Sequence, residues 1–329
     1  MKTTNSLTRS LIILTGDLGS GKTSGLPFLA EQLGAEKPYF IVNEVGASDR
    51  FVGAFNVPSS QLTILPGGCV CCERQDELIA LLNVLVERPQ SEFDSLILET
   101  SGLADPATIL QLVSSHPKLT HQLKIESLVY FLDAGSDREA GQLRTQDLKS
   151  LAVADICVIT KTDAIPLEER TAIVKAVVNA NHTIDIFQQR REHDTVVIDF
   201  TCPGAIKQAS GRLQQVVDDY AEVSGHAHPE VLNFELPFGT SWLALSTWLI
   251  GLLQAKDRTI LRVKVAIPNH RGWISINGVG SMVFPPDSVD FAHGDERPLG
   301  TLVVIGYGLS QVQIVRSLNV FVSDDIKAI

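Results

Sequence analysis

One glycine-rich motif near the start of the chain constrains its fold more than any other feature. Residues 16–23, GDLGSGKT, fit the pattern G-x-x-x-x-G-K-[ST] and directly follow the apolar run 11–14. In such a motif the glycines let the backbone turn tightly, so that its N–H groups face a phosphate. Lys22 can add positive charge at the β- and γ-phosphates, and the Thr23 hydroxyl can hold Mg²⁺. The motif predicts a strand, a phosphate-binding loop and a helix start, and therefore a chain that binds a nucleoside triphosphate.

Apolar segments alternate with helical patterns from residue 10 to about residue 200. Several of the apolar segments lack a polar face, as expected for parallel strands that helices cover on both sides. The predicted fold is α/β, a P-loop NTPase with a mostly parallel sheet covered by helices, plus a smaller C-terminal α+β domain. Strands are expected at residues 11–15, 39–43, 62–65, 95–99, 128–133, 156–160 and 196–200.

The length of the chain, 329 residues, favours two domains. The sequence becomes polar and irregular after residue 203, and this stretch ends in SGHAHP at 224–229. The change indicates a boundary between domains. The predicted division is a P-loop GTPase domain at 1–215, a linker at 216–230 and a C-terminal α+β domain at 231–329. Within the last domain a helix is expected at 242–254, and strands at 260–265, 273–277 and 302–305.

The charge balance argues against nucleic acid as a partner. The formal net charge is −11 at pH 7 and the sequence has no basic run, whereas binding to nucleic acid needs clustered Lys and Arg. The longest mostly apolar run, 241–253, is shorter than the roughly 20 residues that span a membrane. The apolar run before Gly16 is too short for the core of a signal peptide. We expect a cytoplasmic protein with neither a membrane nor a nucleic-acid partner.

The segment TKTD at 160–163 ends an apolar strand and is similar to the guanine-reading Asn-Lys-x-Asp element of GTPases. The Asp163 carboxylate would accept hydrogen bonds from N1–H and N2–H₂ of guanine, a pair of donors that adenine lacks. The stem of Lys161 can lie along the base. Thr160 stands where the GTPase element has Asn, and a solvated turn after a strand is the alternative interpretation.

The segment ETSG at 99–102 follows another apolar strand, at the place of a Walker B strand with a glycine that senses the γ-phosphate. Glu99 is expected to approach the Mg²⁺ shell through water, because Mg²⁺ keeps several waters and needs few carboxylates. The alternative is an acid that caps a helix. Asp105 is the expected N-cap of the next helix, with Pro106 at its first position.

Three of the five cysteines lie together, at Cys69, Cys71 and Cys72. Three thiolates on one soft or borderline metal leave a fourth position for water, a side chain or a transfer partner, which suits an exchangeable metal. A redox pair and plain buried cysteines are the alternatives, although adjacent cysteines would form only a strained disulfide. Glu44, which follows the predicted strand 39–43, could complete a metal site or orient water, and a solvated turn explains it equally well.

Taken together, the segments 16–23, 43–46, 68–72, 99–106 and 160–163 resemble the CobW-like P-loop GTPases in order and spacing. The distal part of the chain is similar to the C-terminal domain of that family. The resemblance implies hydrolysis of GTP to GDP and phosphate, and Zn²⁺ or Co²⁺ at the three cysteines under the control of the nucleotide. It implies a metallochaperone that delivers the metal to a client metalloprotein.

Two other functions stay open from the sequence. A P-loop phosphotransferase would use the same loop on a small acceptor, and a non-hydrolysing metal buffer or assembly factor would use the nucleotide only as a switch. The oligomeric state also stays open, with a homodimer as one arrangement. The residues expected to bind the nucleotide are Gly16, Gly19, Ser20, Gly21, Lys22, Thr23, Ser24, Gly102, Lys161 and Asp163. Those expected in catalysis are Lys22, Thr23 and Glu99, and those expected to bind metal are Thr23, Glu44, Cys69, Cys71, Cys72 and Glu99.

Overall fold

The computed structural model divides the chain into two compact units, residues 1–178 with 184–202, and residues 179–183 with 203–329. Glu44, Cys69, Cys71 and Cys72 lie outside the described residues, as does nearly all of the predicted linker, whose bounds therefore stay predictions. The described residues are 8–32, 35–43, 58–65, 74–102, 104–136, 142–181, 183–192, 195–202, 230–256, 259–268, 272–279, 282–283, 286–290, 300–323 and 326–328.

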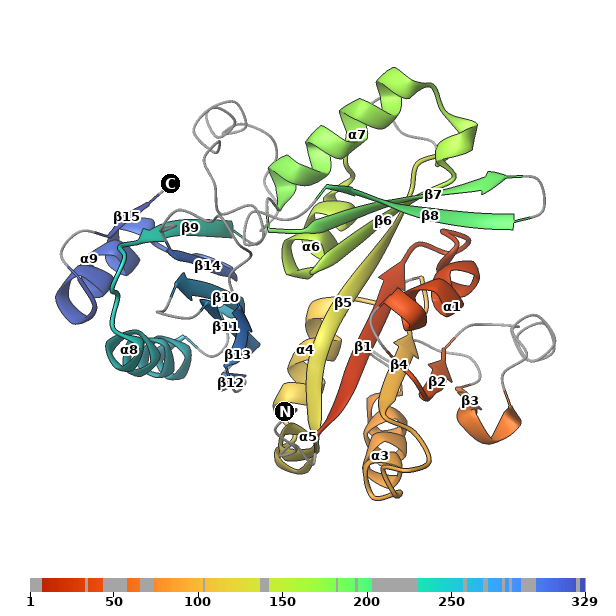
Figure 1. Ribbon diagram of the computed structural model, residues 1–329, viewed down its shortest axis with the longest axis horizontal. Coiled ribbons are helices and arrows are strands. Elements are labelled where there is room, and N and C mark those ends of the chain that lie inside the picture. The colour runs from red at the N-terminus through yellow and green to blue at the C-terminus, as the bar shows by residue number, and fades with distance from the viewer. Residues whose placement is uncertain are drawn as a thin grey trace. The chain divides into compact units, whose positions relative to one another are not determined.

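In the described part of the first unit, eight strands form one sheet in the order β3-β2-β4-β1-β5-β6-β7-β8 (Figure 1). Neighbouring strands are parallel except for β7 and β8, which pair in opposite directions. The predicted mostly parallel sheet is confirmed. The strands are β1 (Arg9–Gly16), β2 (Pro38–Val42), β3 (Leu62–Ile64), β4 (Ser95–Glu99), β5 (Leu123–Asp133), β6 (Ile156–Thr160), β7 (Asp185–Glu192) and β8 (Thr195–Cys202).

Helices cover both faces of this sheet, which explains why strands such as β4 and β6 are buried along their whole length. Successive side chains of β5 point to opposite faces. Phe131 packs in a buried cluster with Leu26 of α1, whereas the hydroxyl of Tyr130 contacts Asp147 of α6. The helices of this unit are α1 (Lys22–Gln32), α3 (Gln75–Val86), α4 (Pro106–Ser114), α5 (Pro117–Gln122), α6 (Thr145–Val153) and α7 (Leu167–Ala180).

The sequence patterns did not predict β7. Its segment DIFQQRRE ends in five consecutive polar residues, so neither a continuous apolar run nor strict alternation marks it. The backbone nevertheless pairs with β6 on one side and with β8 on the other, and the side chain of Gln189 is buried. Tertiary pairing decides the conformation here.

In the part of the second unit that the structure describes, two helices pack against an antiparallel sheet. The helices α8 (Trp242–Ala255) and α9 (Gln311–Phe321) share one apolar core with the sheet, and the indole N–H of Trp248 donates to Ser317 Oγ at 3.0 Å. An α+β C-terminal unit matches the predicted fold class, although β9 and α9 were not predicted. Its strands are β9 (Glu230–Leu236), β10 (Ile260–Pro268), β11 (Gly272–Val279), β12 (Met282–Val283), β13 (Asp287–Asp290), β14 (Gly300–Gly306) and β15 (Lys327–Ala328).

None of the helices in the described ranges has the length and apolarity needed to cross a membrane.

Candidate nucleotide-binding site

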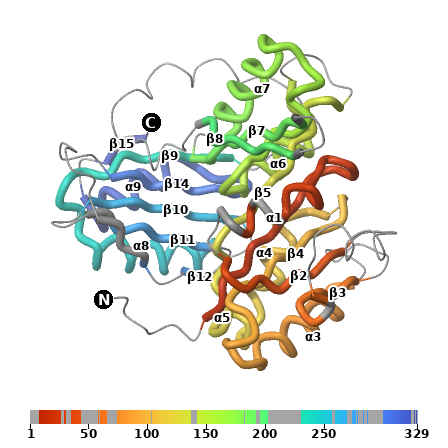
Figure 2. Tube along the Cα trace, turned by 45° about the vertical axis from the view of Figure 1, so that its right-hand side comes forward, coloured from red at the N-terminus to blue at the C-terminus, as the bar shows by residue number. Residues whose placement is uncertain are grey.

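Four neighbouring parallel strands end at one edge of the first sheet. The register pairs Leu14 of β1 with Glu99 of β4, and Asp133 of β5 with Thr160 of β6. Figures 1 and 2 show β1, drawn in red, beside β4 and β5, although both follow it much later in the sequence. Ligands of such sheets bind beyond the carboxyl ends of the strands. The fold therefore brings the P-loop, the ETSG segment and the TKTD segment to a common edge.

The P-loop has the backbone that its glycines allow. Gly19 and Gly21 have φ angles of 73° and 88°, a region that favours glycine. A Cβ on Gly16 would lie 2.4 Å from the carbonyl oxygen of Phe131, so the loop leaves β1 in close contact with β5. The Ser20 hydroxyl is buried and has no hydrogen-bond partner among the described residues, whereas Ser24 is exposed in the first turn of α1.

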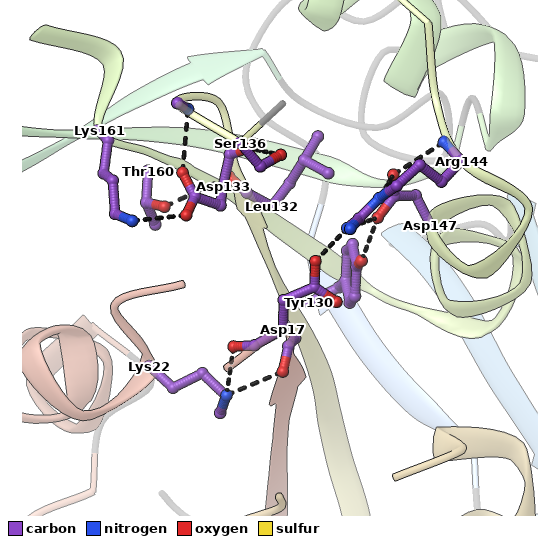
Figure 3. Close-up of polar contacts among 12 residues, drawn as sticks. Asp17, Lys22, Tyr130, Leu132, Asp133, Ser136, Arg144, Asp147, Thr160 and Lys161 are labelled. Atoms are coloured by element: carbon purple, nitrogen blue, oxygen red, sulfur yellow. Dashed lines mark hydrogen bonds and ion pairs between the residues drawn. The ribbon is translucent and has the colours of Figure 1, made fainter. Parts of the chain in front are cut away.

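Lys22 lies across the P-loop. Its side chain is buried, and Nζ donates to the carbonyl oxygens of Gly16 and Asp17, both at 2.8 Å (Figure 3). These bonds fix an ammonium group within the loop that is expected to hold phosphate. The loop thus carries the positive charge that a polyphosphate ligand requires.

Thr23 and Glu99 form the oxygen pair expected at a Mg²⁺ site. Thr23 Oγ1 donates to Glu99 Oε1 at 2.7 Å, and Glu99 is buried at the end of β4. A hydroxyl that donates its proton to a carboxylate keeps its oxygen lone pairs for a cation, and both groups are the hard oxygen donors that Mg²⁺ prefers. These residues therefore fit the ion. Asp105, and not Glu99, caps α4, by accepting a hydrogen bond from the Ala107 N–H at 3.0 Å.

Gly102 packs directly on the P-loop. A Cβ at this position would lie 2.3 Å from the backbone nitrogen of Leu18, a distance that real Cβ atoms do not reach. Only glycine therefore allows the chain after β4 to approach the loop this closely. A change at either segment must be accommodated by the other.

The TKTD segment forms a tight turn after β6. Lys161 has a φ of 56°, and its ammonium contacts Asp133 Oδ2 at 2.5 Å. The buried Thr160 hydroxyl donates to the carbonyl oxygen of Leu132 at 3.4 Å. Asp163 is exposed, and its Oδ1 accepts from the backbone N–H of Arg191 at 3.2 Å. These contacts attach the turn to both β5 and β7. No sequence motif indicated that Asp133 contributes to this turn.

A cluster of polar side chains beside the P-loop was also missed by the sequence patterns. The guanidinium of Arg144 pairs with Asp17 and with Asp147, which is fully buried (Figure 3). Tyr130 donates to Asp147 Oδ1 at 2.6 Å. Burial, and secondarily the Asp147 charge, raise the pKa of Tyr130, so its hydroxyl stays protonated. Arg144 and Asp17 are 127 residues apart and belong to no joint motif.

The metal site predicted at the cysteines stays a prediction. Within the ranges that the structure describes, no group of three or more His, Cys, Asp or Glu side chains is arranged to hold a metal ion. The three cysteines and Glu44 lie outside those ranges. Cys157, which lies apart from these three cysteines in the sequence, is buried in β6.

The parallel sheet, the glycine-shaped loop with its lysine, and the Thr23–Glu99 pair define a P-loop nucleotide-binding protein. The family model described as "CobW/HypB/UreG, nucleotide-binding domain" matches residues 10–188. The chain belongs to this family, which confirms the resemblance noted from its motifs.

Relatives similar to this chain carry names that concern zinc. The "Zinc chaperone YjiA" of Escherichia coli K12 is 28% identical over 321 residues, covering 93% of this chain and 96% of the relative. The "Zinc-regulated GTPase metalloprotein activator 1" of Schizosaccharomyces pombe is 28% identical over 176 residues, 51% of this chain and 43% of that protein. The structure of Zn(II)-bound YjiA GTPase from E. coli matches with a TM-score of 0.55 at 22% identity, over 95% of this chain and 99% of that one, which supports the fold.

Proposed function

We propose that this protein is a GTP-hydrolysing metallochaperone that carries Zn²⁺. GTP and Mg²⁺ bind at the P-loop edge of the sheet, a thiolate loop takes up the metal, and hydrolysis releases it to a client metalloprotein. The observation that carries the proposal is the packing of Gly102 on the P-loop beside the Thr23–Glu99 pair. In this arrangement a ligand at the phosphate site acts on the backbone that follows β4. Membership of the family and full-length similarity to a zinc chaperone support the cargo.

The chain is a GTPase by its family. Its residues promote hydrolysis by positioning the phosphates and by stabilising their negative charge. Lys22 and the loop amides stabilise negative charge on the phosphate oxygens, while Thr23 and Glu99 hold Mg²⁺. When bound, Mg²⁺ neutralises charge that develops on the transferred phosphoryl group. The Ser20 hydroxyl, buried and without a partner in the described part of the loop, adds a donor for a phosphate oxygen.

Guanine recognition is assigned to the TKTD turn. Asp163 is exposed beyond the carboxyl end of β6, where its carboxylate can accept from N1–H and N2–H₂ of the base. Its bond to the Arg191 backbone and the Lys161–Asp133 pair fix the turn. The Thr160 hydroxyl, bonded to β5, replaces the Asn side chain as the anchor of the turn.

Metal binding is assigned to Cys69, Cys71 and Cys72, with Glu44 as a further ligand. Three thiolates fill three positions of a tetrahedral Zn²⁺ site and leave the fourth for Glu44, water or a thiolate of the client. An incomplete thiolate set permits transfer by ligand exchange, which a closed site of four cysteines would resist. This chemistry suits a carrier better than a structural zinc protein.

A competition titration of Zn²⁺ against a chromophoric chelator tests the metal assignment. We expect Cys71→Ser to lose at least tenfold in affinity, with GTP hydrolysis in the absence of metal unchanged. The matched control is Cys157→Ala, which removes a thiol from the core of β6 and is expected to keep the metal affinity of the unchanged protein. Equal losses in both variants would refute the cysteine loop as the site.

A further inference from the structure

The P-loop of this protein contains an acidic residue where it is expected to receive a polyanion. Asp17 directly follows Gly16, and its carbonyl oxygen lies 2.8 Å from Lys22 Nζ. Its carboxylate is only partly exposed, at 24% of the side chain, so water screens its charge incompletely. An uncompensated carboxylate here would repel the phosphates of the nucleotide.

Arg144 supplies a positive charge to this carboxylate from another part of the fold. One of its terminal nitrogens contacts Asp17 Oδ2 and also lies 2.9 Å from Asp147 Oδ1, while its Nε lies 3.1 Å from Asp147 Oδ2 (Figure 3). The two bonds to a fully buried carboxylate fix the direction of the planar guanidinium. Arg144 is therefore held in place, and its charge is aimed at the P-loop.

The carboxylate of Asp147 is also stabilised by groups other than the guanidinium. Tyr130 donates to Oδ1 at 2.6 Å, and the backbone N–H of Arg144 donates to Oδ2 at 2.9 Å. Asp147 also lies in the first turn of α6, where the helix dipole stabilises a negative charge. The guanidinium is thus shared between Asp147 and Asp17, and it is the positive group that contacts the Asp17 carboxylate.

We propose that Arg144 is a positioning residue that neutralises Asp17, so that the P-loop can accept the triphosphate of GTP. This inference rests on the proposed nucleotide site. It assigns to Arg144 a role in binding, through Asp17, and no direct contact with the reacting phosphate.

The test is a double-mutant cycle read by the affinity of a fluorescent GTP analogue. Arg144→Ala should weaken binding about tenfold at low salt, and the loss should shrink as salt is added. Asp17→Asn should bind at least as tightly as the unchanged protein, and Arg144→Ala combined with Asp17→Asn should regain most of the lost affinity. Lys118→Ala, which breaks the 2.5 Å ion pair with Glu87 elsewhere in the unit, should leave affinity unchanged.

The double-mutant cycle distinguishes the neutralisation of Asp17 from a merely structural role of Arg144. Arg144→Ala also leaves Asp147 without its guanidinium, and Asp17→Asn cannot repair that defect. Failure of the double variant to regain affinity, or an unchanged affinity in Arg144→Ala, would overturn the proposal. Arg144→Lys keeps the charge but not the planar guanidinium, so it should lose less affinity than Arg144→Ala, which guards against a variant that fails to fold. Unaltered binding in Lys22→Ala would instead refute the nucleotide site itself.

Discussion

Gly102 joins two segments that are distant in the sequence, because it has no side chain. Its Cα lies so close to the P-loop that an added Cβ would meet the Leu18 nitrogen at 2.3 Å. The backbone atoms of a tight loop cannot shift to relieve a steric clash, whereas the end of a long side chain can. The contact is therefore sensitive to the smallest substitution.

Replacing Gly102 by alanine is expected to displace the P-loop and lower GTP affinity by at least tenfold, with the fold retained. Nucleotide titration and thermal unfolding measure the two effects. Gly251→Ala in α8 is the control, because nothing lies within 4 Å of a Cβ there. Equal affinity in both variants would show that the two segments are not coupled.

A substitution at Glu99 tests whether this residue contributes to the Mg²⁺ site. Glu99→Gln keeps the size of the side chain and removes the charge beside Thr23 Oγ1. We expect the hydrolysis rate to fall by a factor of about 100 and the Mg²⁺ concentration for half-maximal activity to rise. Single-turnover hydrolysis over a range of Mg²⁺ concentrations measures both. An unchanged dependence on Mg²⁺ would exclude Glu99 from the metal site.

The residues of the site that the sequence could predict are those that lie within one contiguous motif. Lys22 and Thr23 follow from the spacing of the P-loop, whose geometry is local. Arg144 could not be predicted in this way, because its contact with Asp17 depends on the path of β5 and α6. Residues that meet only through tertiary packing have no characteristic spacing in the sequence.

At the scale of elements, α1 depends on a glycine where the helix crosses β5. A Cβ on Gly25 would lie 2.7 Å from the ring of Phe131, which is itself buried. Glycine is otherwise unfavourable within a helix by about 1 kcal/mol relative to alanine. The close packing of the helix on the strand therefore outweighs helix propensity at this position.

Gly25→Ala is expected to lower the free energy of unfolding by about 1–3 kcal/mol, because the core cannot absorb the added methyl group. Combining it with Phe131→Leu, which removes the opposing ring atoms, should recover part of the loss. Gly251→Ala in α8 is the control, since nothing lies within 4 Å of a Cβ there. Urea denaturation of the three variants measures these effects, and a stabilised Gly25→Ala would contradict the packing account.

The elements that the sequence could predict are those whose burial leaves a periodic pattern. β4 and β6 are buried on both faces, so their apolar runs are unambiguous. β7 was missed because its polar side chains hide the pattern, and β9 was missed because its segment EVLNFEL mixes polar and apolar residues. Such strands form because their backbones pair with neighbouring strands. The local sequence pattern contains no information about this pairing.

At the scale of the whole molecule, the proposed function requires a nucleotide site and a metal site that are coupled. Hydrolysis can release the metal only if nucleotide and metal change the affinity of the protein for each other. By thermodynamic linkage the two effects must be equal in size. Gly102 packs on the P-loop, so the segment after β4 contacts the backbone that is expected to hold the phosphate.

The coupling of the two sites is tested by the Zn²⁺ affinity in the presence of Mg²⁺ with a non-hydrolysable GTP analogue, with GDP and without nucleotide. We predict that the affinity differs at least about fivefold between the GTP-like and GDP states. Zn²⁺ should change the ratio of the affinities for the GTP analogue and GDP by the same factor. Equal Zn²⁺ affinity in all three states would contradict the account, because a carrier whose two sites are independent cannot use hydrolysis to release its metal.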